Sequence, residues 1–412
     1  MTDRFYDVVI AGGGFVGQSL ALALAKIAPR GFRIALVDAE PSKSGDAIRD
    51  ARASALSAAT KNLLSVLDVW PKLAPDAQAI ESIEITDSPL HAGLRPHLLG
   101  FGDDELKEGE PSAFMVENRD IQHALAAVVA EQPAIDSFTP GSITDFESDA
   151  FRVVSHFATG ETIEAALLVA ADGKRSQLRE RAGIKCVSWS YPQRGIITTV
   201  THTIPHQGRA TQHFLPAGPF AILPLKGNRS AIVWTEEKDR AETIIASNEA
   251  DFLSELTTRF GNHLGELAIV GPIQSFPLDF QVARNFVTDR MVLVGDAAHV
   301  VHPLAGQGLN IGMRDVAALT EIVVEATRLG LDIGSPVQLE HYQRWRRFDS
   351  AFSAAVMDGL NRLFSNDNAP LRALRDLGLG VVDRAPALKR FFVREAAGTT
   401  GNAPRLLLGE SF

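Results

Sequence analysis

The chain has 412 residues, a formal net charge of −10 and one cysteine, Cys186. This length exceeds what one compact core usually covers, so we expect two interleaved domains, and the acidic balance argues against a nucleic-acid partner. A single cysteine excludes a disulfide within the chain, which fits a reducing compartment. No apolar run reaches the roughly 18 residues of a membrane-spanning helix, and a strand predicted from about Asp7 leaves no signal peptide. We therefore expect a cytoplasmic globular protein.

The first predicted element is a buried strand that runs into a glycine-rich turn. Val8 to Ala11 form its apolar run. Gly12, Gly14 and Gly17 follow with the spacing of the dinucleotide-binding fingerprint. In that fingerprint the first glycine permits a tight turn, the second lets the backbone approach a pyrophosphate, and the third lets the next helix pack on the strand. A helix is predicted over 19–27, and its N-terminus offers N–H groups to phosphate.

A second predicted strand, Ile34 to Val37, ends at an acid, Asp38. Asp38 lies 21 positions after Gly17, where a carboxylate can bind a ribose hydroxyl. An acid here suits FAD or NAD and argues against a 2′-phosphate, but it does not choose between FAD and NAD. The competing interpretation is a glycine-rich turn in an unrelated α/β protein.

Two arginines are candidates for contact with an anionic cofactor. Arg52 leads into a helix predicted over 58–67 and could offer forked hydrogen bonds to phosphate; a solvated arginine is the alternative. Arg119 stands at the start of a helix predicted over 120–131, where the helix dipole disfavours positive charge. That local conflict hints at an anionic partner.

In the middle of the chain the predicted secondary structure changes from alternating strands and helices to strands joined by turns. A buried strand over 167–171 ends at Asp172-Gly173, a turn that can present a carboxylate to a ligand, and Ser176 and Arg179 follow. From Trp189 to Trp234, strand-like stretches and turns replace the alternation of strands and helices. We assign this region to a separate sheet that faces the substrate.

The second strong motif follows a buried strand over 290–294. Gly295 and Asp296 stand at the end of that strand, and Asp296 could bond to a ribityl or ribose hydroxyl. Gly306 and Gly308 then bring the backbone close to a flat or charged group. A helix is predicted from Gly308 to Gly330, with its N-terminal amides directed at that group.

At these residues the chain resembles the flavoprotein aromatic hydroxylases of the p-hydroxybenzoate hydroxylase type. Three blocks match in order: Gly12 to Asp38, Asp172-Gly173 with Ser176 and Arg179, and Gly295-Asp296 through Asn310. Within that group the chain is most similar to the ubiquinone-biosynthesis hydroxylases. The segments that carry this closer resemblance are 50–57, 117–119, 189–193, 218–225 and 302–310.

The resemblance implies a mixed α/β (α+β) fold. A Rossmann-like FAD-binding domain would be interleaved with a β-sheet substrate domain and followed by a C-terminal helical segment. We expect the FAD-binding domain in residues 1–75, 101–185 and 265–340, the substrate domain in 76–100 and 186–264, and the helical segment in 341–412.

The resemblance also implies FAD as the cofactor and NAD(P)H as a co-substrate. The residues that match the family's cofactor-binding motifs are Gly12, Gly14, Gly17, Asp38, Arg52, Arg119, Asp172, Gly173, Gly295, Asp296, Gly306, Gly308, Leu309 and Asn310. The first three would hold the pyrophosphate, Asp38 the adenosine ribose, and the two arginines with Asp296 the pyrophosphate and ribityl chain. The backbone at 308–310 would lie near the flavin pyrimidine edge. In the family, the Asp172-Gly173 motif is linked to both FAD and NAD(P)H.

The implied activity is that of an FAD-dependent aromatic-ring monooxygenase. It would use NAD(P)H and O₂, through a flavin C4a-hydroperoxide, to hydroxylate a polyprenylated phenol in ubiquinone biosynthesis. Because the cofactor supplies the difficult chemistry, we expect no nucleophilic triad and no metal site. The candidates for orienting or deprotonating the phenol are Tyr191, His213, His299 and His302, and Pro303 and Gly306 would form a wall beside the reacting face. The alternative for His299 and His302 is a structural role in a tight loop, and the alternative for His213 is a packing or surface position.

Two other functions stay open. One is a flavoprotein reductase of the same fold, and the other is a non-catalytic FAD-bound scaffold of a biosynthetic complex. A flavin halogenase is disfavoured, because the sequence has no Trp-x-Trp motif.

The C-terminal region is basic although the chain as a whole is acidic. From Arg362 to Arg405 there are eight Lys and Arg against four acids, and Phe391 and Phe392 lie beside basic residues. Such a segment can rest on anionic lipid or on a partner protein. We expect peripheral contact with the inner membrane or with a biosynthetic complex; an ordinary helix packed on the FAD-binding domain is the alternative.

Overall fold

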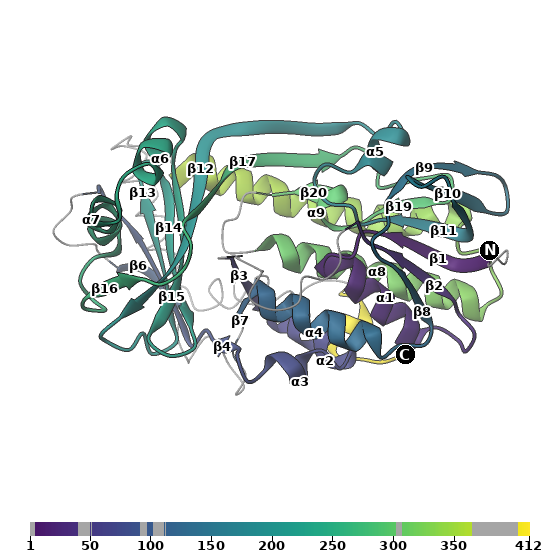
Figure 1. Ribbon diagram of the computed structural model, residues 1–412, viewed down its shortest axis with the longest axis horizontal. Coiled ribbons are helices and arrows are strands. Elements are labelled where there is room, and N and C mark those ends of the chain that lie inside the picture. Colours follow the sequence, from purple (N-terminus) through teal and green to yellow (C-terminus); the bar gives the residue numbers. More distant parts are fainter. Residues whose placement is uncertain are drawn as a thin grey trace.

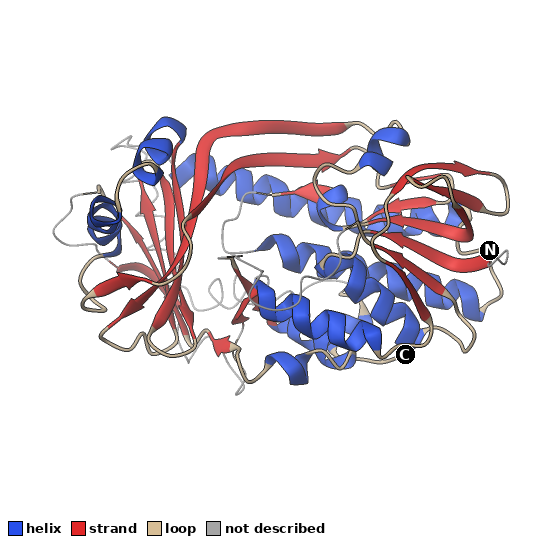
Figure 2. Ribbon diagram, in the orientation of Figure 1, coloured by secondary structure: helices blue, strands red, loops and turns tan. Residues whose placement is uncertain are grey.

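The structure is a computed structural model that describes residues 5–39, 50, 52–90, 97–101, 111, 113–301, 307–364 and 403–412. Two large sheets lie at opposite ends of the molecule, with long helices between them (Figures 1 and 2). The predicted mixed α/β class, with a Rossmann-like unit and a separate β-sheet unit, is confirmed.

The first sheet carries the predicted nucleotide-binding unit. Within the described residues its order is β18-β19-β11-β1-β2-β8, and β10 and β9 continue it from β11. Its strands are β1 (Phe5–Ala11), β2 (Ile34–Val37), β8 (Ile135–Phe138), β9 (Ile143–Ser148), β10 (Val153–Phe157), β11 (Thr162–Ala170), β18 (Val287–Thr288) and β19 (Met291–Leu293). β1 pairs in parallel with β2 and β11. Parallel strands covered on both faces need continuous apolar runs, and Val8, Val9 and Ile10 are fully buried.

Helices from distant parts of the chain pack together beside this sheet. α1 (Phe15–Ile27) contacts both α4 (Asn118–Ala130) and α8 (Gln307–Arg328), and α8 contacts α9 (Pro336–Phe364). The shorter helices of this part are α2 (Ala58–Val66), α3 (Trp70–Leu73) and α5 (Gln177–Arg181). The Ser57 hydroxyl caps α2 by accepting from the Thr60 amide at 3.2 Å, which explains why that helix begins where it does.

The second sheet forms the other end of the molecule. In the described part of the chain its order is β20-β17-β12-β15-β14-β13-β5-β6, with β16 beside β12. Its strands are β5 (Ser82–Asp87), β6 (His97–Phe101), β12 (Cys186–His202), β13 (Arg209–Leu215), β14 (Gly218–Leu225), β15 (Arg229–Glu237), β16 (Leu267–Ile269), β17 (Gln274–Ala283) and β20 (His299–Val300). The long strands β12 and β17 run across the molecule and join its two ends (Figure 1).

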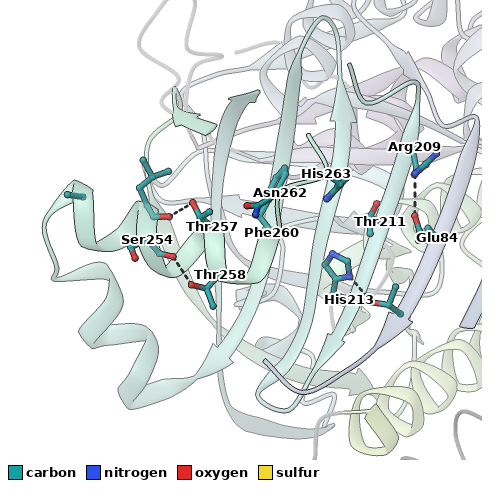
Figure 3. A pocket seen from close by; sticks show the side chains of 14 residues that line it. Glu84, Arg209, Thr211, His213, Ser254, Thr257, Thr258, Phe260, Asn262 and His263 are labelled. Atoms are coloured by element: carbon teal, nitrogen blue, oxygen red, sulfur yellow. Dashed lines mark hydrogen bonds and ion pairs between the residues drawn. The ribbon is translucent and has the colours of Figure 1, made fainter. Parts of the chain in front are cut away.

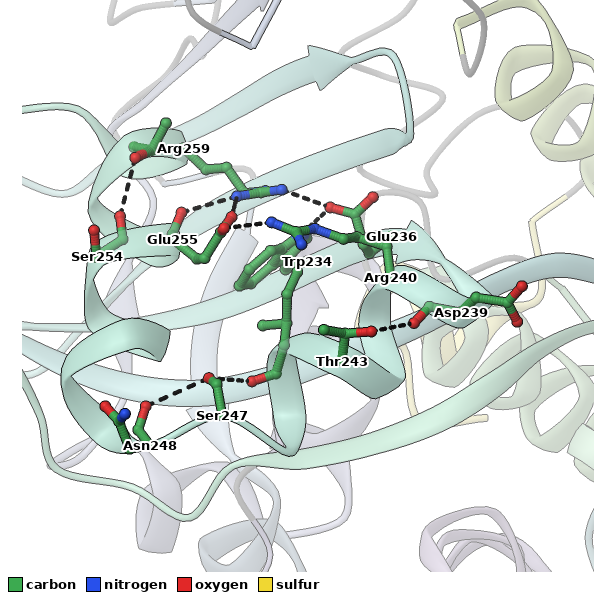
Figure 4. Close-up of polar contacts among 12 residues, drawn as sticks. Trp234, Glu236, Asp239, Arg240, Thr243, Ser247, Asn248, Ser254, Glu255 and Arg259 are labelled. Atoms are coloured by element: carbon green, nitrogen blue, oxygen red, sulfur yellow. Dashed lines mark hydrogen bonds and ion pairs between the residues drawn. The ribbon is translucent and has the colours of Figure 1, made fainter.

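The outer face of the second sheet is covered by α6 (Lys238–Ile245) and α7 (Glu249–Phe260). Beneath them, the Arg259 guanidinium donates to the Glu236 carboxylate at 2.8 Å and lies 4.3 Å from the centre of the Trp234 ring (Figure 4). Trp234 Nε1 also donates to Glu236 at 3.2 Å. All three side chains are buried, so the paired charges and the ring fasten α7 to the sheet.

A small third sheet fills the space between the two units. It joins β3 (Ala53–Ser57), β7 (Ala113–Glu117) and β4 (Gln78–Ala79). Ala55 and Met115 from this sheet pack against Ala210, Leu225 and Ala231 on the inner face of the second sheet. The third sheet is therefore joined to the second sheet by a small apolar cluster.

The predicted FAD-binding range 265–340 contributes strands to the second sheet as well as to the first. We expected residues 265–340 to belong to the FAD-binding domain, but β16 and β17 pair with β12 in the second sheet. The difference arises because strand pairing joins segments that are distant in sequence, and alternation alone does not say which sheet a strand enters.

α9 forms the longer of the two described parts of the predicted C-terminal helical segment. It begins at Pro336 rather than at 341, and residues 365–402 lie outside the described residues. The chain is described again at 403–412, where η3 (Arg405–Leu408) buries Leu406 and Leu407 against α2. Of the helices in the described part, none combines the length and the apolar character needed to cross a membrane.

Candidate functional site

A pocket of about 450 Å³ lies between the Rossmann unit and the inner face of the second sheet. We call it the interdomain pocket. One wall comes from the starts of α1 and α8, from β3, and from the turns at Asp172-Gly173 and Gly295-Asp296. The other wall comes mainly from β12 to β15 and β17, and it is largely apolar. Its volume lies within the usual range for ligand sites.

The glycine-rich turn after β1 is built as its spacing predicted. Gly12 has φ +119°, a conformation that favours glycine, and a Cβ there would collide with the carbonyl oxygen of Ala171. A Cβ on Gly17 would collide with the carbonyl oxygen of Gly12. By contrast, a Cβ on Gly14 would meet no described atom within 4 Å, and Gly14 lines the interdomain pocket. The turn thus presents open backbone at the N-terminus of α1.

Asp38 lies at the end of β2, against the same turn. A Cβ on Gly13 would collide with the Asp38 carboxylate, so this side chain folds over the glycine turn. Asp38 does not line the interdomain pocket itself. Its place beside the turn is the one expected for a carboxylate that binds a ribose hydroxyl.

Of the two predicted arginines, only Arg52 lines the interdomain pocket. Its guanidinium donates two hydrogen bonds, of 2.9 and 2.8 Å, to the Asp50 carboxylate. Burial raises the pKa of Asp50, but the hydrogen bonds from Arg52 outweigh that effect and hold the pKa below its ordinary value. Arg119 instead pairs with Glu117 at 3.1 Å and with Asp120 at 3.5 Å, outside the lining.

Asn118 is a lining residue whose role we did not predict. Its Oδ1 accepts from the Ser54 hydroxyl at 2.7 Å, and both residues face the interdomain pocket. The sequence placed Asn118 only next to Arg119. The turn into α4 directs the asparagine inward and the arginine outward, because successive residues at a helix start point in different directions.

The Gly295-Asp296 turn brings a carboxylate to the interdomain pocket. Asp296 lines the pocket as an exposed residue between buried neighbours, Gly295 and Ala297. Desolvation raises the pKa of this carboxyl, and the charges of His299, Arg52 and Lys174 oppose the rise. Gly295 has φ +58°, which favours glycine at this turn.

The Asp172-Gly173 turn is tied to the Gly295-Asp296 turn by Arg179. This buried guanidinium donates to the carbonyl oxygen of Ala297 at 2.9 Å and to that of Lys174 at 3.0 Å. The Asp172 carboxylate accepts from the Leu178 amide at 3.3 Å. The matched residues therefore form one connected structure at the ends of β11 and β19.

Asn310 fastens the start of α8 to β3 and α2. Its Nδ2 donates to the carbonyl oxygen of Ala55 at 2.8 Å, and its Oδ1 accepts from the Ser57 amide at 3.0 Å and the Thr60 hydroxyl at 2.7 Å. Because this side chain is satisfied by protein groups, it holds Gly308 and Leu309 at the interdomain pocket, which both line.

A buried charge network lies under the Gly295-Asp296 turn, and the sequence analysis missed it. The Asp315 carboxylate accepts from the Gly295 amide at 2.9 Å, from His299 Nε2 at 2.7 Å and from Arg346 Nε at 2.7 Å. Asp315 is fully buried, and His299 and Arg346 are 2% and 1% exposed. Burial raises the pKa of Asp315, but the positive charges of His299 and Arg346 reverse this and lower it. Arg346 also pairs with Asp349.

The predicted phenol-orienting residues do not gather at the interdomain pocket. His299 is engaged with Asp315 in the buried network. Tyr191 donates to Asp358 at 2.6 Å and links β12 to α9. His302, Pro303 and Gly306 lie outside the described residues.

His213 faces away from the interdomain pocket. On β13 it shares a row with Phe220 and Trp234, which pack beneath α6 and α7. Its Nδ1 lies 2.7 Å from the Thr86 hydroxyl, and the ring borders a larger hollow of about 970 Å³ on the outer face of the sheet (Figure 3). His213 therefore does not line the interdomain pocket, because alternate residues of a strand face opposite sides. Its role in orienting the phenol stays a prediction that this placement does not support.

Replacing His213 with asparagine is expected to leave the predicted phenol-stimulated NAD(P)H oxidation unchanged. The side chain is separated from the interdomain pocket by the thickness of the sheet, so only a modest loss of stability should follow. Steady-state oxidation assays and a thermal melt of the variant check both parts. A large fall in turnover in a variant that retains its FAD would contradict this placement.

The residues at the interdomain pocket fit a dinucleotide cofactor. The glycine turn leaves open backbone beside the start of α1, where a diphosphate would find amide donors. Asp296 at the pocket and Asp38 beside the glycine turn offer carboxylates for hydroxyl groups. Arg52 offers a positive charge, and the start of α8 adds a second helix N-terminus. In the described part of the chain, no group of three or more His, Cys, Asp or Glu is arranged to hold a metal ion.

Comparisons with known proteins agree with this geometry. Residues 5–348 match the model of a family described as an FAD binding domain. The chain is 43% identical over 411 residues to ubiquinone hydroxylase UbiL of Rhodospirillum rubrum, covering 99% of this chain and 94% of that protein. It is 35% identical over 402 residues to 3-demethoxyubiquinol 3-hydroxylase of Escherichia coli K12, and the alignment covers 97% of this chain and 100% of that protein.

The fold also occurs among solved structures. The crystal structure of p-nitrophenol 4-monooxygenase PnpA from Pseudomonas putida DLL-E4 matches with a TM-score of 0.78, over 97% of this chain and 100% of that chain. The sequences are 19% identical, so this match shows the shared fold alone.

Proposed function

The chain belongs to the FAD-binding domain family and is an FAD-dependent aromatic-ring monooxygenase, and on that premise we propose that it hydroxylates a polyprenylated phenol in ubiquinone biosynthesis. Its relatives UbiL and 3-demethoxyubiquinol 3-hydroxylase carry ubiquinone-pathway names and align along almost the whole chain. The predicted resemblance, the enzyme class and the FAD cofactor are confirmed, and the reductase and scaffold alternatives lose their support.

The observation that carries the proposal is the contrast between the two walls of the interdomain pocket. One wall presents glycine backbone, Arg52 and Asp296, as a polar cofactor requires. The facing wall presents Ile197, Leu223 and Phe276, as an aromatic ring with an apolar tail requires. FAD, when bound and reduced by NAD(P)H, supplies the activation of O₂ and the transfer of one oxygen atom.

The protein's own contribution is to hold the ring against the cofactor and to exclude water. The apolar wall removes water from the reacting face, which protects reactive species from side reactions. The starts of α1 and α8 provide fixed positive dipole ends toward the cofactor wall. Hydrogen bonds of Arg179 and Asp315 hold the Asp172-Gly173 and Gly295-Asp296 turns in place.

The test is an assay of the purified, FAD-loaded protein with a short-chain prenylphenol. We expect NAD(P)H oxidation to rise when the phenol is added, and the product mass to increase by one oxygen atom. Faster oxidation that yields only peroxide would mean that this phenol is not the substrate. FAD-bound protein that oxidises no NAD(P)H with any phenol would contradict the proposed activity.

We also propose that the basic C-terminal segment meets the inner membrane or a biosynthetic complex, since a prenylated substrate resides in lipid. The support comes from the sequence: Lys389, Arg390 and Arg394 lie beside two phenylalanines, and such patches bind anionic lipid. Replacing these three with glutamate is expected to reduce sedimentation with anionic liposomes. Binding that is unchanged by the triple substitution would remove the membrane part of the proposal.

A further inference from the structure

One polar side chain interrupts the apolar wall of the interdomain pocket. Gln212 on β13 has Ile85 on β5 as its neighbour on one side and Ala221 on β14 on the other. The same row continues through Val233 on β15 to Ile197 on β12. Residues directly opposite each other on paired strands face the same side of a sheet, so this row faces the interdomain pocket. Among the described residues that the second sheet contributes to the lining, Gln212 alone has a polar side chain.

The Gln212 side chain has a buried hydrogen-bond donor that no described group accepts. Its Nε2 is shielded from solvent and has no hydrogen-bond partner among the residues that the structure describes. An unpaired buried amide is costly, because folding removes its hydrogen bonds with water and replaces them with nothing. The side chains beside it in the row are hydrocarbon and cannot accept a hydrogen bond.

The neighbouring glutamines show how unusual this is. Gln193 Nε2 on β12 donates to the carbonyl oxygen of Ala217 at 2.7 Å. Gln281 Nε2 on β17 donates to the carbonyl oxygen of Lys174 at 3.2 Å. The amides of Gln193 and Gln281 bind backbone carbonyl groups and so stabilise the fold. The Gln212 Nε2 lies at the interdomain pocket and donates to no described group.

We propose that Gln212 is the residue that recognises the oxygen substituent of the aromatic substrate, by donating a hydrogen bond from Nε2 to a ring hydroxyl or phenolate oxygen. The assignment rests on the proposed function, because it takes an oxygenated ring as the occupant of the interdomain pocket. A single directional donor in an apolar wall fixes the rotation of a flat ring, while the hydrocarbon around it accepts the rest of the molecule. Which ring carbon faces the cofactor then depends on this bond.

The experiment compares binding of two ligands to FAD-loaded wild type and to Gln212→Leu. The ligands are a short-chain prenylphenol and the matching prenylbenzene that lacks the ring oxygen, and binding is followed by the change in flavin absorbance. We expect wild type to prefer the phenol, and Gln212→Leu to bind the phenol about 3- to 10-fold more weakly, the usual value of one neutral hydrogen bond. Affinity for the oxygen-free ligand should not fall.

Thr211→Val is the matched control. Thr211 precedes Gln212 on β13 and lines the hollow on the outer face of the sheet, so its substitution should not change the preference for the phenol. Gln212→Met, of similar length, serves as a second apolar variant if the leucine variant retains little FAD. The FAD content and the melting temperature of each variant separate loss of fold from loss of the donor.

The outcomes distinguish this inference from the proposed function. An unchanged preference for the phenol in both Gln212 variants would overturn the assignment of Gln212, whether or not the phenol is hydroxylated. Binding of the phenol without its hydroxylation, together with a lost preference in the variants, would overturn the proposed function and support the assignment. An equal loss of affinity for both ligands would mean that Gln212 acts only through its shape in the pocket wall. That result would overturn its role as a hydrogen-bond donor.

Discussion

Gly14→Val is expected to weaken FAD binding by about 10- to 100-fold while the protein without FAD stays folded. A side chain on Gly14 meets no described protein atom within 4 Å, and its φ of −72° and ψ of −176° suit any residue. The valine therefore fits the protein but occupies the open space beside the start of α1, where overpacking costs about 1–3 kcal/mol. Titration of the apoprotein with FAD, followed by fluorescence, measures the effect.

Gly359→Val is the control for this substitution. Gly359 is an exposed residue of α9, and a Cβ there also meets no described atom within 4 Å. The Gly359→Val variant should bind FAD with the same affinity as the wild type. Normal FAD affinity in Gly14→Val would show that the cofactor does not approach this turn, and the assignment of the glycine fingerprint would have to be withdrawn.

Asp315→Leu is expected to destabilise the protein by about 3–5 kcal/mol, the usual cost of removing one partner from a buried ion pair. The substitution leaves Arg346 and His299 without the carboxylate that they share, in a region where Arg346 is 1% exposed. It also removes the acceptor of the Gly295 amide, so FAD affinity should fall together with stability. Urea unfolding and FAD titration measure the two effects.

Two comparisons test the cause of this loss. The double variant Asp315→Leu/Arg346→Met removes both charges and should recover part of the stability, because an apolar pair of similar volume has no uncompensated charge. Arg344→Met breaks an exposed pair with Glu340 on α9, in which the arginine is 78% exposed, and should cost at most about 1 kcal/mol. If Asp315→Leu costs no more than Arg344→Met, the network does not support the turn.

The cofactor side of the pocket could be predicted because its motifs are local. Gly12, Gly14, Gly17 and Asp38 lie within one strand–turn–helix–strand unit, so spacing along the chain determines their positions in space. The same holds for Gly295 and Asp296 at the end of β19. Arg119 was less predictable, since the direction of its side chain depends on how α4 begins rather than on its distance from a motif.

The substrate side could not be predicted to the same degree. His213 and Gln212 are adjacent on β13, and of the two only the histidine was a candidate from the sequence, with a packing or surface position as its alternative. Strand pairing put the histidine beneath α7 and the glutamine at the interdomain pocket. A shift of one residue along a strand exchanges the two faces of a sheet, and the sequence carries no local signal that sets this register.

The sequence by itself determined the glycine turns, because these depend on short-range spacing and on backbone conformations that only glycine adopts easily. The fold class and the choice of FAD came from the resemblance of these motifs, taken together, to the aromatic hydroxylases. Only the tertiary structure decided which face of the second sheet meets the cofactor and that Asp315, on α8, joins His299 to Arg346 on α9. It also decided that β16 and β17 enter the second sheet. These features arise from contacts between residues far apart in the chain, which form only when the sheets and helices have packed together.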